Sequence, residues 1–174
     1  MSRKVLIAYF SHEGEAYAAG KIVTLKIGNT RAAAEMMAEM TGADLHRIET
    51  IQPYPFNYME TVEIAQKEQE QNARPKLQET NPDMASYDTI ILGYPNWWGT
   101  MPMAVFTFLE QYDFSGKTIL PFCTHEGSGM GHSESDIKKL CPDAKLGQGL
   151  AVTGNRVNKA QKDIENWLKK AGIL

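Results

Sequence analysis

The feature that most constrains this chain is a set of short, continuous apolar runs with helical segments between them. A parallel β-strand covered by helices on both faces needs continuous apolarity, whereas a half-exposed strand alternates. Residues 5–10, 89–94, 118–123 and 146–152 fit the continuous pattern. Residues 44–49 mix apolar with polar side chains, which suits a strand at the edge of a sheet. The sequence therefore predicts five strands.

Apolar residues at helical spacing fill most of the gaps between these runs. The spacing predicts helices near residues 30–41, 101–112, 133–140 and 157–171, and Gly42 stands where the first helix should end. The segment 53–82 is more polar, and we expect a loop, a solvated helix near 58–71 and a second loop. We interpret the charged and amide side chains of that helix as an exposed face.

The alternation of strands and helices predicts one α/β domain over residues 1–174. We expect a doubly wound, five-stranded parallel sheet in the order 2-1-3-4-5, with right-handed crossovers and helices on both faces. This order places the weak strand 44–49 at an edge. A ligand should then bind beyond the carboxyl ends of strands one, three and four.

The charge and cysteine content exclude some function classes. The formal net charge of −3 and the pI near 5.8 argue against a nucleic-acid binder and give no help to binding at anionic membranes. Cys123 and Cys141 are two scattered thiols without a CxxC motif, which favours a reducing compartment. The apolar run near the N-terminus is too short for a signal peptide or a membrane span, so we expect a cytoplasmic protein.

A phosphate site is predicted after the first strand. Ser11 ends this strand, and Gly28, Asn29 and Thr30 open the following helix. A helix N-terminus leaves backbone N–H groups free and attracts anions, while the serine, asparagine and threonine side chains add donors. The alternative is that Asn29 or Thr30 simply caps the helix.

An aromatic site is predicted after the third strand, where residues 93–99 read GYPNWWG. Trp97 and Trp98 are adjacent in a short loop, and both cannot easily point into a core. Exposed tryptophan is costly unless it covers something, and a flat aromatic ligand stacks well on such a ring. We expect one indole to pack under the loop and the pair to flank a ligand.

A third loop follows the fourth strand, where residues 124–129 read THEGSG. Its glycines let the backbone approach a ligand closely and free N–H groups for the edge of a ring. The alternative is a plain glycine-rich turn. Because the three loops follow strands that the predicted order brings together, they offer a phosphate cradle, an aromatic lid and a backbone-rich clasp at one place.

These residues resemble the flavodoxin family, most closely bacterial flavodoxin-like proteins with S…GNT, GYPxWWG and THEGSG loops. The resemblance covers nearly the whole chain and implies a flavodoxin-like fold and one non-covalent FMN. It implies no metal. Its cofactor-binding residues are Ser11, Gly28, Asn29 and Thr30 at the phosphate, Pro95, Asn96, Trp97, Trp98 and Gly99 on one side of the flavin, and Thr124, His125, Glu126, Gly127, Ser128 and Gly129 on the other.

One departure from the compact pattern is the long insert 12–27 between Ser11 and Gly28. Val23, Leu25 and Ile27 alternate with polar residues there, which indicates a short strand or hairpin arm. The resemblance leaves the role of the insert open.

The resemblance is specific for fold and cofactor but not for the physiological reaction, and three functions, with electron transport favoured, are compatible with it. The favoured one is an electron carrier between redox partner proteins. The second is an NAD(P)H-dependent FMN or quinone oxidoreductase on the same fold, and the third is a binding module without redox turnover. We expect no catalytic side chain, because the flavin supplies the chemistry.

Overall fold

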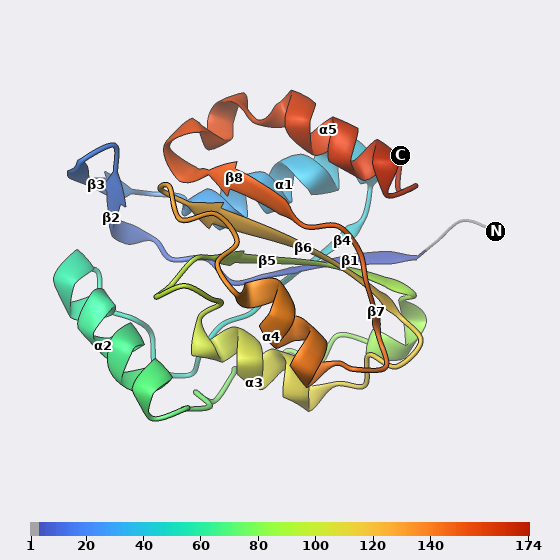
Figure 1. Ribbon diagram of the computed structural model, residues 1–174, viewed down its shortest axis with the longest axis horizontal. Helices are drawn as coiled ribbons and strands as arrows, with labels where there is room; N and C mark the ends of the chain where they lie inside the picture. Colours follow the sequence, from blue (N-terminus) through green and yellow to red (C-terminus); the bar gives the residue numbers. More distant parts are fainter. Residues whose placement is uncertain (1–3) are drawn as a thin grey trace.

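The centre of the molecule is a parallel sheet, seen edge-on in Figure 1. The structure is a computed structural model that describes residues 4–174. The sheet runs in the order β4-β1-β5-β6, and both β7 and β8 lie along the far side of β6. Its strands are β1 (Val5–Tyr9), β4 (Asp44–Arg47), β5 (Thr89–Pro95), β6 (Thr118–His125), β7 (Lys145–Leu146) and β8 (Leu150–Thr153).

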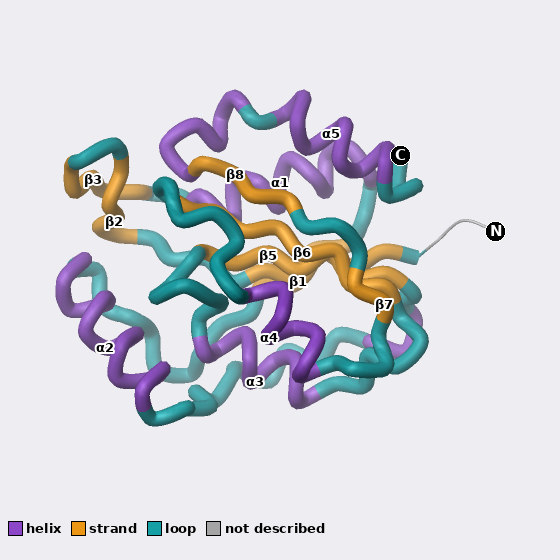
Figure 2. The backbone as a smooth tube through the Cα atoms, viewed as in Figure 1, coloured by secondary structure: helices purple, strands orange, loops and turns teal. Residues whose placement is uncertain are grey.

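Helices cover both faces of this sheet (Figures 1 and 2). Helices α1 (Asn29–Thr41) and α5 (Gln161–Lys170) lie on one face, and α3 (Met103–Gln111) and α4 (Ser133–Leu140) lie on the other. Helix α2 (Tyr58–Glu70) lies at the carboxyl end of the sheet. Two short 3-10 helices, η1 (Met84–Ser86) and η2 (Gly154–Lys159), precede β5 and α5. Among residues 4–174, no helix combines the length and the apolar character needed to cross a membrane.

Two apolar layers hold the helices against the sheet. Leu6, Ile90 and Phe108 belong to the layer under α3 and α4, whereas Ile7 and Ile91 belong to the layer under α1 and α5. Neighbouring residues of β1 and β5 thus contribute to opposite layers, because successive side chains of a strand point to opposite faces. This is why the strands read as continuous apolar runs.

The predicted strand order is confirmed, with 44–49 at the edge, but the fifth strand is not continuous. The predicted strand 146–152 is divided into β7 and β8, which pair with β6 at Thr118–Ile119 and at Phe122–His125. The stretch of β6 between these two pairings contains Pro121, which pairs with β5 on its other side and has no N–H to donate to a ladder. The carbonyl of Gln148 in the break accepts a hydrogen bond from Trp167 Nε1 at 2.8 Å instead.

The insert after Ser11 forms a β-hairpin. Strands β2 (Gly14–Ala18) and β3 (Lys21–Leu25) pair antiparallel. The two turn residues Ala19 and Gly20 both have positive φ, at 50° and 85°, as in the type I′ turns that suit the twist of a hairpin. The hairpin lies beside α2 at the same end of the sheet as the three predicted loops (Figure 1).

Candidate functional site

A cavity of about 530 Å³ lies at the carboxyl ends of β1, β5 and β6. This is the position expected for a ligand in a sheet of this order. The lining residues from the strand ends and from the loops that follow them are Ser11, Asn29, Thr30, Pro95, Asn96, Trp97, Trp98, Gly99, Thr124, His125, Glu126, Ser128 and Gly154. Hairpin β2–β3 and helix α2 supply the remaining wall.

The first loop forms a tight cradle at the N-terminus of α1. Ser11 Oγ accepts a hydrogen bond from the backbone N–H of Arg31 at 3.1 Å, so its own proton is free for another acceptor. A Cβ atom on Gly28 would lie 2.2 Å from Ser11 Oγ and 2.6 Å from the His12 carbonyl oxygen. Only glycine therefore fits behind the serine. Asn29 and Thr30, in the first turn of α1, line the cavity beside it, and the free N–H groups of a helix N-terminus favour anions.

The cradle is joined to the third loop by side chains. Thr30 Oγ1 and Thr124 Oγ1 lie 2.8 Å apart and are both buried. Next to them, Glu126 Oε2 accepts a hydrogen bond from Asn155 Nδ2 at 2.5 Å, whereas Glu126 Oε1 is buried with no partner among the described residues. An unpaired buried carboxylate oxygen is costly, so this atom fits a ligand that donates a hydroxyl group.

The two tryptophans of the second loop have different surroundings. Trp97 packs edge-on against Phe10 and Tyr54, with ring centroids 5.2 and 5.0 Å apart. Trp98 is 46 % exposed, and its Nε1 donates to the Val62 carbonyl oxygen at 3.0 Å. As predicted, one indole packs under the loop, and it is Trp97.

Backbone conformation sets this arrangement. Trp98 and Gly99 have φ values of 55° and 87°, and the tight turn is closed by a 2.8 Å hydrogen bond from Trp97 N to Thr100 O. A positive φ is rare for a bulky residue such as tryptophan. It turns the two indoles in different directions and leaves Trp98 against α2.

Asn96 ties the second loop to the third. Its backbone N–H donates to the Thr124 carbonyl oxygen at 2.9 Å, and its side-chain amide donates to the Gly129 carbonyl oxygen at 2.9 Å. Its side-chain oxygen accepts from the Gly99 N–H at 3.0 Å. Fixed loops of this kind can present backbone groups to a ligand without reorganising.

Two buried titratable groups, in strands β5 and β6, stay neutral. Burial raises the pKa of the Cys123 thiol to about 12, and it also raises the pKa of the Tyr94 hydroxyl. Tyr94 donates to Ser133 Oγ at 2.8 Å. Neither group therefore adds negative charge beside a bound ligand.

The structure brings the predicted site residues together at one cavity. All of them line it except Gly28, Gly127 and Gly129. Gly28 lies behind Ser11, while Gly127 and Gly129 take φ values of 122° and 65° within the third loop. These three glycines shape the loops. The binding roles of all the predicted residues remain predictions.

Sequence reasoning missed the wall built by the hairpin and α2. The residues of this wall are His12, Glu15, Ala16, Tyr17, Leu25, Tyr58, Thr61, Val62 and Ala65. In α2 they are spaced i, i+3, i+4 and i+7, so this helical stripe was the available signal. The helix was predicted, but its inward face was not assigned to the site.

Hairpin and helix form one continuous wall. The Glu15 N–H donates to the Phe56 carbonyl oxygen at 2.8 Å, and Glu15 Oε1 accepts from the Tyr58 N–H at 3.3 Å. The rings of Tyr17 and Tyr58 stack with centroids 6.4 Å apart. The cavity is therefore bounded by the insert as well as by the strand ends.

Comparisons with known proteins agree with this geometry. A sequence model of the flavodoxin family matches residues 4–171. A protein from Bacteroides eggerthii assigned as a flavoprotein has 29 % identity and a TM-score of 0.77, over 98 % of this chain and 99 % of that one. A comparison with curated proteins found no match.

A second solved structure, a flavoprotein from Lactobacillus acidophilus in complex with FMN, has 22 % identity and a TM-score of 0.66. It covers 91 % of this chain and 98 % of that one, and at this identity it supports the fold. The α/β order of the sheet and the match over residues 4–171 lead to one conclusion. The chain belongs to the flavodoxin family.

Proposed function

We propose that this protein binds one FMN non-covalently and carries electrons between redox partner proteins. The observation that carries the proposal is the meeting of three loops at one cavity: an anion cradle, an exposed tryptophan and a backbone-rich loop. Membership of the flavodoxin family supports FMN as the ligand. A redox flavin can accept and donate one or two electrons, which is the chemistry that the bound group would supply.

The residues present fit this cofactor. Ser11, Asn29 and Thr30 would hold the phosphate through hydroxyl, amide and backbone donors. The partnerless Oε1 atom of Glu126 would accept from a hydroxyl of the sugar chain. Trp98 would cover one side of the ring, and the loop 124–129 would bond its polar edge and exclude water from it.

The second candidate, an NAD(P)H-dependent FMN or quinone oxidoreductase, is favoured by one observation. The wall of Tyr17, Tyr58 and Val62 extends the cavity beyond the strand-end loops, which gives room for a small second ligand. An electron carrier does not need such a compartment, whereas a reductase does.

Two assays on the purified holoprotein separate these functions. The first measures steady oxidation of NADH or NADPH with a quinone as acceptor. The second measures whether photoreduced protein passes electrons to a protein acceptor such as cytochrome c. Slow pyridine-nucleotide oxidation with fast transfer to the protein acceptor supports the carrier, and the reverse supports the reductase. A colourless protein that takes up no FMN would support a binding module instead.

We also propose that the protein is cytoplasmic and that its partners are neither nucleic acids nor membranes. Cys123 and Cys141 are both free and buried, which suits a reducing compartment. The net charge of −3 suits a redox partner with a basic docking face.

A further inference from the structure

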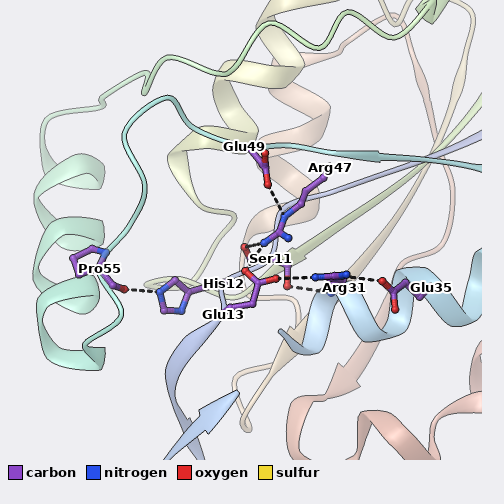
Figure 3. A network of polar contacts seen from close by, with 8 residues as sticks. All are labelled: Ser11, His12, Glu13, Arg31, Glu35, Arg47, Glu49 and Pro55. Carbon is purple, nitrogen blue, oxygen red and sulfur yellow. Dashed lines mark hydrogen bonds and ion pairs between the residues drawn. The ribbon is translucent and has the colours of Figure 1, made fainter. Parts of the chain in front are cut away.

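The turn that carries Ser11 is held from outside the cavity by a charged network (Figure 3). Arg47, at the end of edge strand β4, donates from Nη2 to the Ser11 carbonyl oxygen at 3.3 Å. The same nitrogen pairs with the Glu13 carboxylate. Glu13 belongs to the insert that the compact family pattern lacks, so the insert supplies the carboxylate of the Glu13–Arg47 ion pair.

The network neutralises two guanidinium groups close to the cradle. Arg47 is flanked by Glu13 and Glu49, the latter at 3.3 Å from Nε. Arg31 pairs with Glu13 at 3.4 Å and with Glu35 at 2.8 Å. Burial alone raises the pKa of the Glu13 carboxyl, but the hydrogen bond and charge of Arg47 outweigh it, so the net pKa lies below its usual value.

Neither arginine is placed to bind a ligand directly. Arg31 and Arg47 do not line the cavity, and Glu13 does not line it either. What reaches the cavity is the Ser11 side chain, whose backbone Arg47 holds, and the N-terminus of α1, which begins two residues before Arg31. The charged groups thus act on the cradle through its backbone.

We propose that Glu13 and Arg47 are positioning residues for the phosphate loop, which fix the Ser11 turn so that a phosphate is held by uncharged donors. The proposal rests on the proposed function, because it assumes that the cradle receives the phosphate of FMN. It gives the insert a role besides its contribution to the cavity wall.

The test compares FMN with riboflavin, which has the same ring and sugar chain but no phosphate. Apoprotein is titrated with each flavin, and the quenching of flavin fluorescence gives both dissociation constants. The variants are Glu13→Gln, Arg47→Met and the double variant. Glu165→Gln and Arg74→Met are matched controls, since each breaks an ion pair outside the cavity wall.

Each single variant should weaken FMN roughly 3- to 10-fold and leave riboflavin within about twofold, as expected for a partly buried charge pair. The double variant should be little weaker than the worse single one, because the two side chains act as a unit. The controls should leave both constants unchanged. If circular dichroism shows that the neutral variants do not fold, Arg47→Lys is used, since it keeps the charge but loses the forked contact.

Four results would overturn the inference. Tighter FMN binding in Glu13→Gln would mean that the carboxylate only repels the phosphate. A parallel loss of riboflavin affinity would mean general damage to the site. Wild-type apoprotein that binds neither flavin would overturn the proposed function as well, whereas wild-type binding with unaffected variants overturns the positioning role alone.

Discussion

The hydroxyl oxygens of Thr30 and Thr124 lie 2.8 Å apart, although the residues are 94 positions apart in the chain. Thr30 is in the first turn of α1, and Thr124 is near the end of β6. This buried hydrogen bond joins the phosphate cradle to the loop expected at the polar edge of the flavin. It joins two of the three predicted binding loops directly.

Thr124→Val should separate these loops with little change in volume. The Thr30 hydroxyl would lose its partner inside the protein, which costs about 1–3 kcal/mol in the free energy of unfolding. FMN affinity should fall as well, because both residues line the cavity. Urea denaturation and FMN titration measure the two effects. Thr107→Val, in a buried position of α3 away from the cavity, should lower stability without changing FMN affinity.

Gly28→Ala tests the cradle by steric exclusion. Gly28 has an ordinary φ of −63°, so alanine brings no backbone strain. Its Cβ would nevertheless lie 2.2 Å from Ser11 Oγ, and the serine must move. We expect FMN affinity to fall by more than about tenfold, equal to about 1.4 kcal/mol of binding free energy.

The matched control for this change is Gly149→Ala. Its Cβ would meet only the ends of the flexible Met130 and Glu134 side chains. Equal FMN affinity for wild type and Gly28→Ala would exclude the cradle as the phosphate site.

The two adjacent tryptophans should lose stability to different extents on replacement by alanine. Trp97→Ala removes an indole that packs on Phe10 and Tyr54 and should cost about 3–5 kcal/mol in the free energy of unfolding. Trp98→Ala removes a half-exposed ring and one hydrogen bond, so its cost should be about 1 kcal/mol. FMN affinity should nevertheless fall in Trp98→Ala. A large loss of stability with unchanged FMN affinity in this variant would contradict the assignment of Trp98 to the ring.

The contribution of the Glu13–Arg47 ion pair to stability should depend on pH in a defined direction. The folded pKa of Glu13 lies below its ordinary value of 4.5, so its contribution to stability is complete above that pH. The contribution is lost as the pH falls through the folded pKa, because the carboxylate then takes up a proton. Near neutral pH, we expect the free energy of unfolding of the wild-type apoprotein to exceed that of Glu13→Gln by about 1 kcal/mol or less.

Urea denaturation of both proteins from neutral to acid pH checks this expectation. The difference in unfolding free energy should shrink as the solution becomes acid. A difference that grows on acidification would show that the sign of the pKa shift is wrong.

Strand order and the meeting of the three loops could be predicted from the sequence, because both follow from local patterns. A continuous apolar run such as residues 90–92 indicates a strand that is buried on both faces, whichever strands lie next to it. The break between β7 and β8 could not be predicted in the same way, because it coincides with Pro121 on a different strand. Pairing between distant segments decides such details.

The wall of hairpin and helix was missed for a related reason. Tyr17 and Tyr58 lie 41 positions apart, and they meet where Glu15 hydrogen-bonds to the backbone of Phe56 and Tyr58. The alternation in the insert predicted an extended arm but not the surface on which it docks. The charged side chains of α2 suggested an exposed helix, and its apolar stripe was too short to outweigh them.

The most direct test of the central claim, that three strand-end loops hold one FMN, is a titration of ¹⁵N-labelled apoprotein with FMN followed by NMR. We expect saturation at one FMN per chain, with the largest amide shifts at Ser11, Asn29, Thr30, Asn96–Gly99 and Thr124–Ser128. Shifts that cluster elsewhere, or spectra that do not change at saturating FMN, would contradict the account.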